Sequence, residues 1–350
     1  MKSDIRAVSC LFLALAAIGL SGCSSQANST APAGPVTLKG AGATAPYLAY
    51  TKWIDAYKKE APAVTVQYQA TGSGDGLKQL ESGAVDFAAS DVPLSDEEMA
   101  RMSVKPLHFP TLIGAIVPVY NLAGIGELKF TGDTLAGVFS GKIKSWNDPA
   151  LAKANSGVAL PASRIVVVHR ADASGSTFAF TDFLARVNEP WKSAIGADAT
   201  VKWPVGEAAA GNEALAALVK KTPNSIGYVE LNYAIEQQLA YGAVQNSGGK
   251  FRKADLESMG AAIDGVQNMK NDFRASIVNA RADAAYPIST LTWLVVPSRF
   301  SDAGKLKAMK EFLRWIYGPG QKLAMSTDYG VLQPPLLNYV NDQVGEIQSR

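Results

Sequence analysis

The chain has 350 residues, of which 47% are hydrophobic and 18% are charged, a composition that can bury a sizeable core and excludes global disorder. Its length is generous for one domain and comfortable for two. The formal net charge is +2 at pH 7, and the basic residues are scattered, so solvated faces are expected rather than a nucleic-acid-binding surface.

The N-terminal residues have the features of a targeting segment. Lys2 and Arg6 precede an apolar run over residues 10–20 that is too short to span a bilayer. The stretch Leu20-Ser21-Gly22-Cys23 resembles a bacterial lipobox, so we expect cleavage before Cys23 and its lipidation. An ordinary signal peptide with an incidental cysteine is the alternative.

This interpretation divides the start of the chain into two parts. Residues 1–22 are expected to be a signal peptide, and residues 23–35 a lipidated tether that is polar, contains proline and stays flexible. Cys23 would be the single cysteine of the mature chain, so no intramolecular disulfide is expected.

Alternating strand and helix patterns begin at residue 36. Residues 36–39 predict a strand, and Pro46 opens a helix with Tyr50, Trp53, Ile54 and Tyr57 on one face. Further strands are predicted at 64–68, 85–89, 113–119, 165–168, 225–229 and 291–296, and further helices through 77–80, 180–187 and 303–317. Such repeats predict an α/β fold with a largely parallel sheet.

Three loops share one design. Each follows a predicted strand, is rich in glycine, serine or threonine, and leads into a helix; they are 42–45, 72–74 and 174–177. Such a loop presents free backbone N–H groups and hydroxyl donors at the positive end of a helix. One alone could be a plain helix cap. Three at the carboxyl ends of strands, where α/β sheets bind ligands, favour an anion site.

Charged residues beside these loops refine the prediction. Arg170 offers a planar fork suited to an oxyanion, and Asp172 can orient it; a simple salt bridge between the two is the alternative. Asp91 would repel an anion unless that anion carries a proton, as phosphate does near neutral pH and sulfate does not. Asp91 would then select against sulfate. Capping of a helix indicated by 96–98 is the alternative.

Enzymatic alternatives have little support in the sequence. Ser174 is close to His169, but their spacing matches no serine-hydrolase motif, and no G-x-S-x-G is present. A metal-dependent phosphatase would need clustered ligands, and the chain has 2 histidines. Residues 72–76 lack the Gly-Lys-Ser/Thr of a P-loop. A phosphatase is therefore the weaker alternative, and neither metal nor cofactor is expected.

Several motifs, in order along the chain, resemble the periplasmic phosphate-binding proteins of the high-affinity phosphate ABC transporter. They are GAGAT at 40–44, GSGDG at 72–76, VDFAASDVPLS at 85–95, HRADASGSTFAFT at 169–181 and VKWPVG at 201–206. The resemblance covers essentially all of residues 36–350. It implies a lipid-anchored protein of the bacterial cell envelope that binds inorganic phosphate and delivers it to permease subunits in the inner membrane. A phosphate-binding adhesion lipoprotein without a transport role is the alternative.

The resemblance also implies which residues contact phosphate. They are Thr44, the backbone of Ala45, Ser73, Asp91, Arg170, Ser174, Gly175 and Ser176, with Asp172 as the orienting residue. Two positions depart from the family pattern, since Ala45 replaces an aromatic residue and Ser176 replaces a threonine. Neither change removes a donor, because the first residue donates from its backbone and the second keeps a hydroxyl.

The implied fold is the two-lobed periplasmic binding protein fold (type II), with the ligand in the cleft. Lobe I is expected to be discontinuous, over 36–112 and 290–350, and lobe II to span 113–289. Two crossing strands, near 113–119 and 287–294, would join the lobes.

Overall fold

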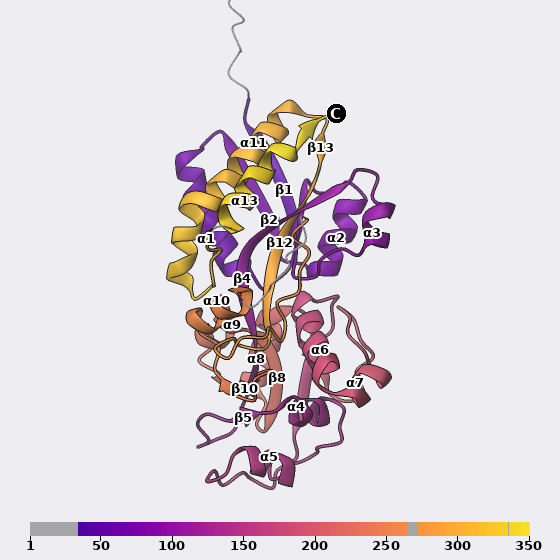
Figure 1. Ribbon diagram of the computed structural model, residues 1–350, viewed down its shortest axis with the longest axis vertical. Helices are drawn as coiled ribbons and strands as arrows, with labels where there is room; N and C mark the ends of the chain where they lie inside the picture. The colour runs from indigo at the N-terminus through magenta and orange to yellow at the C-terminus, as the bar shows by residue number, and fades with distance from the viewer. Residues whose placement is uncertain (1–33, 265–271, 335) are drawn as a thin grey trace, which may run out of the picture. The chain divides into compact units, whose positions relative to one another are not determined.

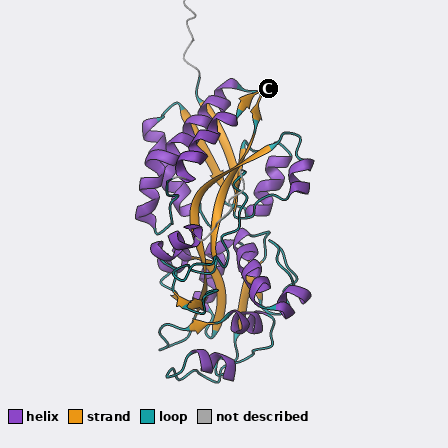
Figure 2. Ribbon diagram, viewed as in Figure 1, coloured by secondary structure: helices purple, strands orange, loops and turns teal. Residues whose placement is uncertain are grey.

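The computed structural model describes residues 34–264, 272–334 and 336–350. The predicted signal peptide, Cys23 and most of the tether lie outside these residues. Within them, one mixed sheet has the strand order β2-β1-β3-β12-β4-β8-β6-β7, with helices on its faces (Figures 1 and 2).

Two long antiparallel strands occupy the middle of this sheet, β4 (Pro106–Tyr120) and β12 (Ser289–Pro297). Both are buried over almost their whole length, which accounts for their continuous apolar sequences. Strand β4 is longer than the predicted 113–119, since it begins at Pro106 and runs through Pro110. The register shifts opposite Pro110, between Thr292 and Trp293, and such an irregularity tolerates a residue that has no N–H to donate.

Lobe I, defined here by strands β1 to β3, lies at one end of the crossing strands. β1 pairs in parallel with both β2 and β3. The strands are β1 (Val36–Gly42), β2 (Val64–Gln69) and β3 (Phe87–Ser90), and the helices between them are α1 (Tyr47–Glu60), α2 (Ser73–Glu81) and α3 (Asp96–Arg101). The C-terminal elements return to this lobe (Figure 1) as β13 (Arg299–Phe300), α11 (Ala303–Trp315), a π-helical turn (Ile316–Gly320), α12 (Gln321–Ala324), α13 (Leu336–Gln343) and β14 (Gln348–Ser349).

Lobe II, defined by strands β6 to β8, lies at the other end. Its strands are β6 (Val166–Arg170), β7 (Glu207–Ala209) and β8 (Ser225–Glu230), with a small sheet of β5 (Lys129–Phe130), β10 (Ala243–Gln245) and β11 (Phe251–Arg252), and β9 (Ala240–Tyr241) paired to β4. Its helices are α4 (Gly132–Phe139), α5 (Pro149–Ala154), α6 (Gly175–Val187), α7 (Glu189–Ala194), α8 (Gly211–Lys221), α9 (Leu231–Glu236) and α10 (Leu256–Asp264).

The predicted α/β architecture is confirmed, and two details are corrected. The sheet is mixed rather than largely parallel, because the chain leaves lobe I in β4 and returns in β12 in the opposite direction. Pro46 precedes α1 as its N-cap residue instead of lying in its first turn. On the predicted face of α1, Tyr50, Trp53 and Tyr57 are buried, while Ile54 is half-buried.

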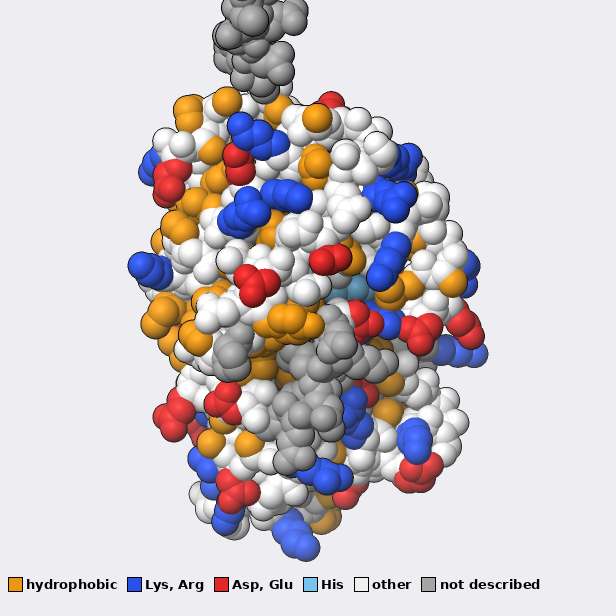
Figure 3. Space-filling view, turned by 45° about the horizontal axis from the view of Figure 1, so that its top comes forward, with side chains coloured by type: hydrophobic (Ala, Val, Ile, Leu, Met, Phe, Trp, Pro, Cys, Tyr) orange, Lys and Arg blue, Asp and Glu red, His pale blue; other side chains and the backbone are white. Residues whose placement is uncertain are grey.

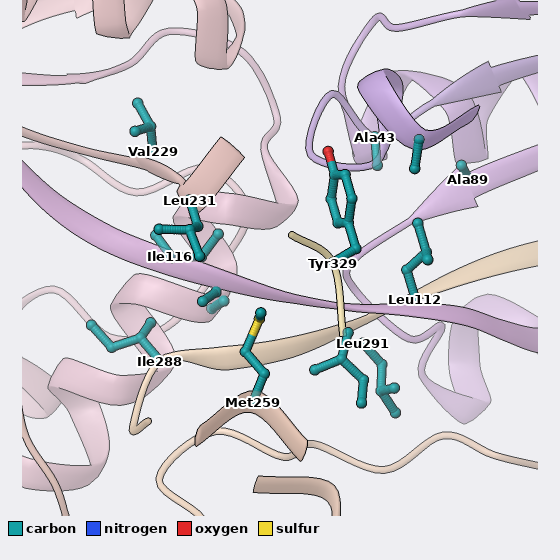
Figure 4. Close-up of a cluster of buried hydrophobic side chains, with 14 of the residues drawn as sticks. Ala43, Ala89, Leu112, Ile116, Val229, Leu231, Met259, Ile288, Leu291 and Tyr329 are labelled. Carbon is teal, nitrogen blue, oxygen red and sulfur yellow. The ribbon is translucent and has the colours of Figure 1, made fainter. Parts of the chain in front are cut away.

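The core continues from one lobe into the other along the crossing strands. Figure 4 shows Leu112 and Ile116 of β4 beside Ile288 and Leu291, with Met259 packed near them. All are almost completely buried. Each such side chain contributes roughly 1.5–3 kcal/mol of hydrophobic stabilisation, so the crossing strands are firmly held in both lobes.

The surface carries both signs of charge. Figure 3 shows lysine and arginine side chains interspersed with aspartate and glutamate over one face. Among the residues that the structure describes, no helix combines the length and apolarity needed to cross a bilayer.

Candidate functional site

The three predicted loops meet where lobe I faces lobe II. Ser73 begins α2 and Asp91 follows β3, both in lobe I, whereas Gly175 begins α6 in lobe II. A Cβ atom added to Gly175 would lie 2.5 Å from the Ser73 hydroxyl oxygen and 2.5 Å from a carboxylate oxygen of Asp91. The two lobes are therefore in contact at this point, and a glycine is needed to let them approach.

The loop between β1 and α1 is held by tyrosine hydroxyls. Three consecutive carbonyls accept hydrogen bonds, that of Ala43 from Tyr68 at 2.6 Å, that of Thr44 from Tyr233 at 2.8 Å and that of Ala45 from Tyr329 at 2.7 Å. The Tyr233 bond joins the lobes, because this residue belongs to α9. The Ala43 N–H donates to the Ala89 carbonyl at 2.8 Å, whereas the Ala45 N–H makes no hydrogen bond to any described residue and is available to a ligand.

Asp91 is a buried carboxylate at the end of β3, with 1% of its surface exposed. Its backbone N–H donates to the Ser73 hydroxyl at 3.2 Å, and its Oδ1 accepts from the hydroxyl of Thr292 on β12. Burial raises the pKa of Asp91 to about 6, although the Thr292 hydrogen bond and the charge of Arg170 oppose this shift. The group is thus poised to hold or accept a proton near neutral pH.

Helix capping does not explain Asp91. Helix α3 begins at Asp96 and is capped by Ser95, whose hydroxyl accepts from the Glu98 N–H at 3.2 Å. The Glu98 carboxylate in turn accepts from the Ser95 N–H at 2.8 Å. This reciprocal capping box satisfies the helix end without Asp91, so the alternative considered from the sequence is wrong.

Arg170 ends β6 and is 3% exposed. Its Nε donates to Asp172 Oδ1 at 2.7 Å, and its Nη2 pairs with the other carboxylate oxygen of Asp172. Asp172 also accepts from the Gly211 N–H at 3.0 Å. Burial raises the pKa of Asp172, but the bonds from Arg170 and Gly211 outweigh it and the net pKa is lowered.

One guanidinium nitrogen of Arg170 has no such partner. Nη1 is buried and makes no hydrogen bond to the part of the chain that the structure describes. A buried charged donor without a partner is costly. The predicted salt bridge is present, and Asp172 fixes one edge of the guanidinium while Nη1 stays available for the predicted ligand contact.

Helix α6 presents its N-terminus to the same region. Ser174 is its N-cap residue, and the Ser174 hydroxyl accepts from the Thr177 N–H at 3.1 Å. The N–H groups at the start of a helix lack intrahelical partners and carry partial positive charge. Gly175 and Ser176, which follow the cap, are therefore placed to bind an anion through the backbone.

The predicted hydroxyls share one hydrogen-bonding pattern, in which each accepts from an N–H group. Thr44 accepts from Asn212, Ser73 from the Asp91 backbone, Ser174 from the Thr177 backbone, and Ser176 from Asn212. A hydroxyl that accepts in this way still has its own hydrogen to donate. The region is accordingly rich in donors, and Asp91 is a carboxylate acceptor among them.

The structure thus brings all the predicted contact residues and Asp172 into one region, and it adds residues that the sequence analysis missed. They are Asn212, Thr292, Glu230 and the three tyrosines that bond the first loop. Asn212 and Thr292 contact site residues 168 and 201 positions away, so no local motif identified them. Glu230 is fully buried, and burial raises its pKa to about 8, so it is largely protonated at neutral pH.

The features expected of a hydrolase are not brought together. The His169 ring stacks on Trp203 with centroids 5.1 Å apart, and its Nδ1 contacts the Arg170 carbonyl at 3.1 Å. No hydrogen bond joins His169 to Ser174 among the described residues. The same part of the chain contains no group of three or more His, Cys, Asp or Glu that could hold a metal.

Comparison with known proteins finds relatives of one kind. The family model for a PBP superfamily domain matches residues 28–319. The chain is 38% identical over 327 residues to the phosphate-binding protein PstS of Xylella fastidiosa, covering 91% of this chain and 89% of that protein. It is 39% identical over 310 residues to PstS of Pasteurella multocida, covering 88% and 89%.

A solved structure shares the fold. The phosphate-binding protein from Stenotrophomonas maltophilia matches with a TM-score of 0.69 at 21% identity, over 87% of this chain and 93% of that one. This likeness, with the mixed sheet and the two crossing strands described above, assigns the chain the two-lobed binding-protein fold.

Proposed function

Because this chain belongs to the PBP superfamily, and within it to the family of the PstS phosphate-binding proteins, we propose that it binds inorganic phosphate in the cell envelope and delivers it to an ABC transporter for import. The observation that carries the proposal is Arg170. Its guanidinium is buried and clamped by Asp172, with Nη1 left without a partner among the described residues.

Phosphate would lie between donors from both lobes. Arg170 Nη1, the hydroxyls of Thr44, Ser73, Ser174 and Ser176, and the backbone N–H groups of Ala45 and the α6 N-terminus would bind its unprotonated oxygens. Asp91 would accept the remaining proton of hydrogen phosphate. The ligand would be bound without metal and without turnover, because every group in this set donates to or accepts from the ligand and none is arranged as an activated nucleophile.

The proposal includes the lobe boundaries, the lipid anchor and the permease partners predicted from the sequence. Lobe I would comprise 36–112 and 290–350, and lobe II 113–289, with β4 and β12 as the crossings. Cys23 would carry a lipid that tethers the protein to the envelope membrane. The permease subunits in the inner membrane would receive phosphate when the lobes separate.

Calorimetric titration of residues 34–350 in a metal chelator tests the proposal. We expect one phosphate per chain and far weaker sulfate binding, because a fully ionised sulfate facing Asp91 incurs like-charge repulsion on the order of several kcal/mol. In Asp91→Asn the phosphate-to-sulfate affinity ratio should fall, whereas in the exposed control Asp75→Asn it should not. Absence of phosphate binding by the wild type would contradict the proposal.

A further inference from the structure

Asn212 is the residue that links the phosphate-contacting hydroxyls of the two lobes. It is the second residue of α8, and its side chain is fully buried. Its amide nitrogen lies 2.8 Å from the hydroxyl of Thr44 in lobe I and 3.2 Å from that of Ser176 in lobe II. Both hydroxyls belong to the predicted phosphate contacts.

The orientation of the Asn212 amide is fixed by its other end. Its Oδ1 accepts from the backbone N–H of Glu230 at 3.0 Å. A backbone N–H can only donate, so the atom facing Glu230 must be oxygen, and the Nδ2 group must face the two hydroxyls. The amide therefore has a single satisfactory orientation.

This orientation determines which way the hydroxyl hydrogens point. The Nδ2 group has two hydrogens and nothing to accept with, so Thr44 and Ser176 act as acceptors toward it. Ser176 is also 3.5 Å from Asn212 Oδ1, at the limit of hydrogen bonding and longer than the Glu230 contact. Each hydroxyl hydrogen is then free to point away from Asn212 and toward a ligand.

We propose that Asn212 is a positioning residue, which holds the hydroxyls of Thr44 and Ser176 as donors toward the bound anion. The inference rests on the proposed phosphate function and deepens it. Without the amide, both hydroxyls could rotate and donate to it or to another acceptor, and part of the binding free energy would go into reorienting them. A single amide thus prepares one donor in each lobe.

The rival explanation is purely structural. Through its bond to the Glu230 backbone, Asn212 also fastens α8 to the end of β8. Loss of that bond would lower stability and could weaken phosphate binding indirectly. A structural effect of this kind does not depend on whether Thr44 and Ser176 have hydroxyls.

A double-mutant cycle separates the two roles, with inorganic phosphate as the ligand. We compare wild type, Asn212→Ala, Thr44→Val/Ser176→Ala and the triple variant by calorimetric titration, and record thermal unfolding of each. Asn212→Ala should weaken phosphate binding about tenfold in the wild-type background. In the background without the two hydroxyls, the same substitution should change affinity by roughly twofold or less.

The matched control is Asn246→Ala. Asn246 is another buried asparagine of lobe II, and it donates to the carbonyls of Asp283 and Ala285 outside the site. Its effect on phosphate affinity should be equal in both backgrounds. Should Asn212→Ala fail to fold, Asn212→Asp replaces it, because a carboxylate keeps the acceptor for Glu230 and loses both amide donors. The added charge repels phosphate in both backgrounds, so for this variant only the difference in affinity loss between the two backgrounds is compared.

The outcomes are distinct. An equal loss of affinity for the Asn212 variant in both backgrounds overturns the positioning role while leaving phosphate binding intact. Failure of the wild type to bind phosphate in the same titrations overturns the proposed function and this inference with it. A loss confined to the background that retains the hydroxyls supports the inference.

Discussion

Burial sets the protonation of Asp91 before any ligand arrives. Its pKa rises from 3.8 to about 6 in the folded chain, chiefly because the charged form loses its hydration. The folded state therefore binds more protons than the unfolded state between these two values. The resulting stabilisation is present below pH 3.8 and is lost as the pH rises through about 6.

Asp91→Asn should consequently raise the stability of the unliganded protein at neutral pH. A shift of this size corresponds to roughly 1–3 kcal/mol, and the gain should disappear toward about pH 4. Urea unfolding of the phosphate-free protein at several pH values measures this gain in the free energy of unfolding. Asp75→Asn is the control for loss of one negative charge. A gain that does not change with pH would assign the effect to packing instead.

The contribution of Arg170 to phosphate binding is expected to depend on the shape of its guanidinium as well as on its charge. Arg170→Lys keeps a positive charge but loses the fork that binds Asp172 and a ligand together. Both Arg170→Lys and Arg170→Ala should weaken phosphate binding, the alanine variant more strongly, by about one to two decades. Titration beside the exposed control Arg164→Ala measures this, and unchanged affinity in Arg170→Ala would place the residue outside the site.

Individual residues differ in how far the sequence could predict them. Arg170, Asp172 and Ser174 to Ser176 fall within one short stretch, so their chemistry could be predicted together. Asn212 and Thr292 could not be predicted, because each forms a hydrogen bond with a residue that the fold brings close from a distant part of the chain. The tyrosine hydroxyls that fix the first loop were missed because a tyrosine in an apolar pattern predicts only core.

The loops that follow β1, β2 and β6 were the most predictable elements. Each joins a strand and a helix whose apolar periods are clear, and its glycines and hydroxyls are local signals. The direction and register of β12 against β4 were not predictable from periodicity, since they depend on where the C-terminal part of the chain returns. The extension of β4 through Pro110 was missed because proline usually ends a strand.

Helix α2 makes a close contact with lobe II through a glycine. The Gly74 N–H donates to the Ala173 carbonyl at 3.0 Å, and a Cβ on Gly74 would lie 2.5 Å from the Ala173 side chain. This contact joins the two lobes in the arrangement that the structure shows. It therefore reports on closure rather than on the folding of either lobe.

Gly74→Ala should weaken phosphate binding by more than it lowers the stability of the unliganded protein. The added methyl group obstructs closure, while alanine is favoured over glycine in a helix by up to about 1 kcal/mol. Phosphate titration and thermal unfolding measure the two effects. Gly126→Ala is the control, because a Cβ there meets nothing within 4 Å. Equal affinities for both variants would argue against a closure contact.

The groups proposed to bind the ligand are divided between the two lobes. Thr44, Ser73 and Asp91 come from lobe I, and Arg170 and the α6 N-terminus come from lobe II. Direct bonds such as Tyr233 to the Thr44 carbonyl close the same interface. An anion that binds both sets favours the closed arrangement by its greater affinity for it.

The proposed attachment to the membrane depends on Cys23, which lies outside the residues that the structure describes. If Cys23 carries the lipid, Cys23→Ala should release the protein from membranes or leave its signal peptide uncleaved. Fractionation of cells that express the full chain, with immunodetection of the precursor and mature forms, measures this. A cleaved variant that stays fully with the membranes would contradict the lipobox interpretation.

We expect one buried phosphate to bridge Asp91 and Arg170 between the lobes. A crystal structure of residues 34–350 grown with equimolar phosphate, and without sulfate or other added oxyanions, tests it most directly. The expected result is a phosphate with one oxygen within hydrogen-bond distance of the Asp91 carboxylate and another bound to Arg170 Nη1. A phosphate bound at any other place, or Nη1 engaged by a protein group with no anion present, would contradict it.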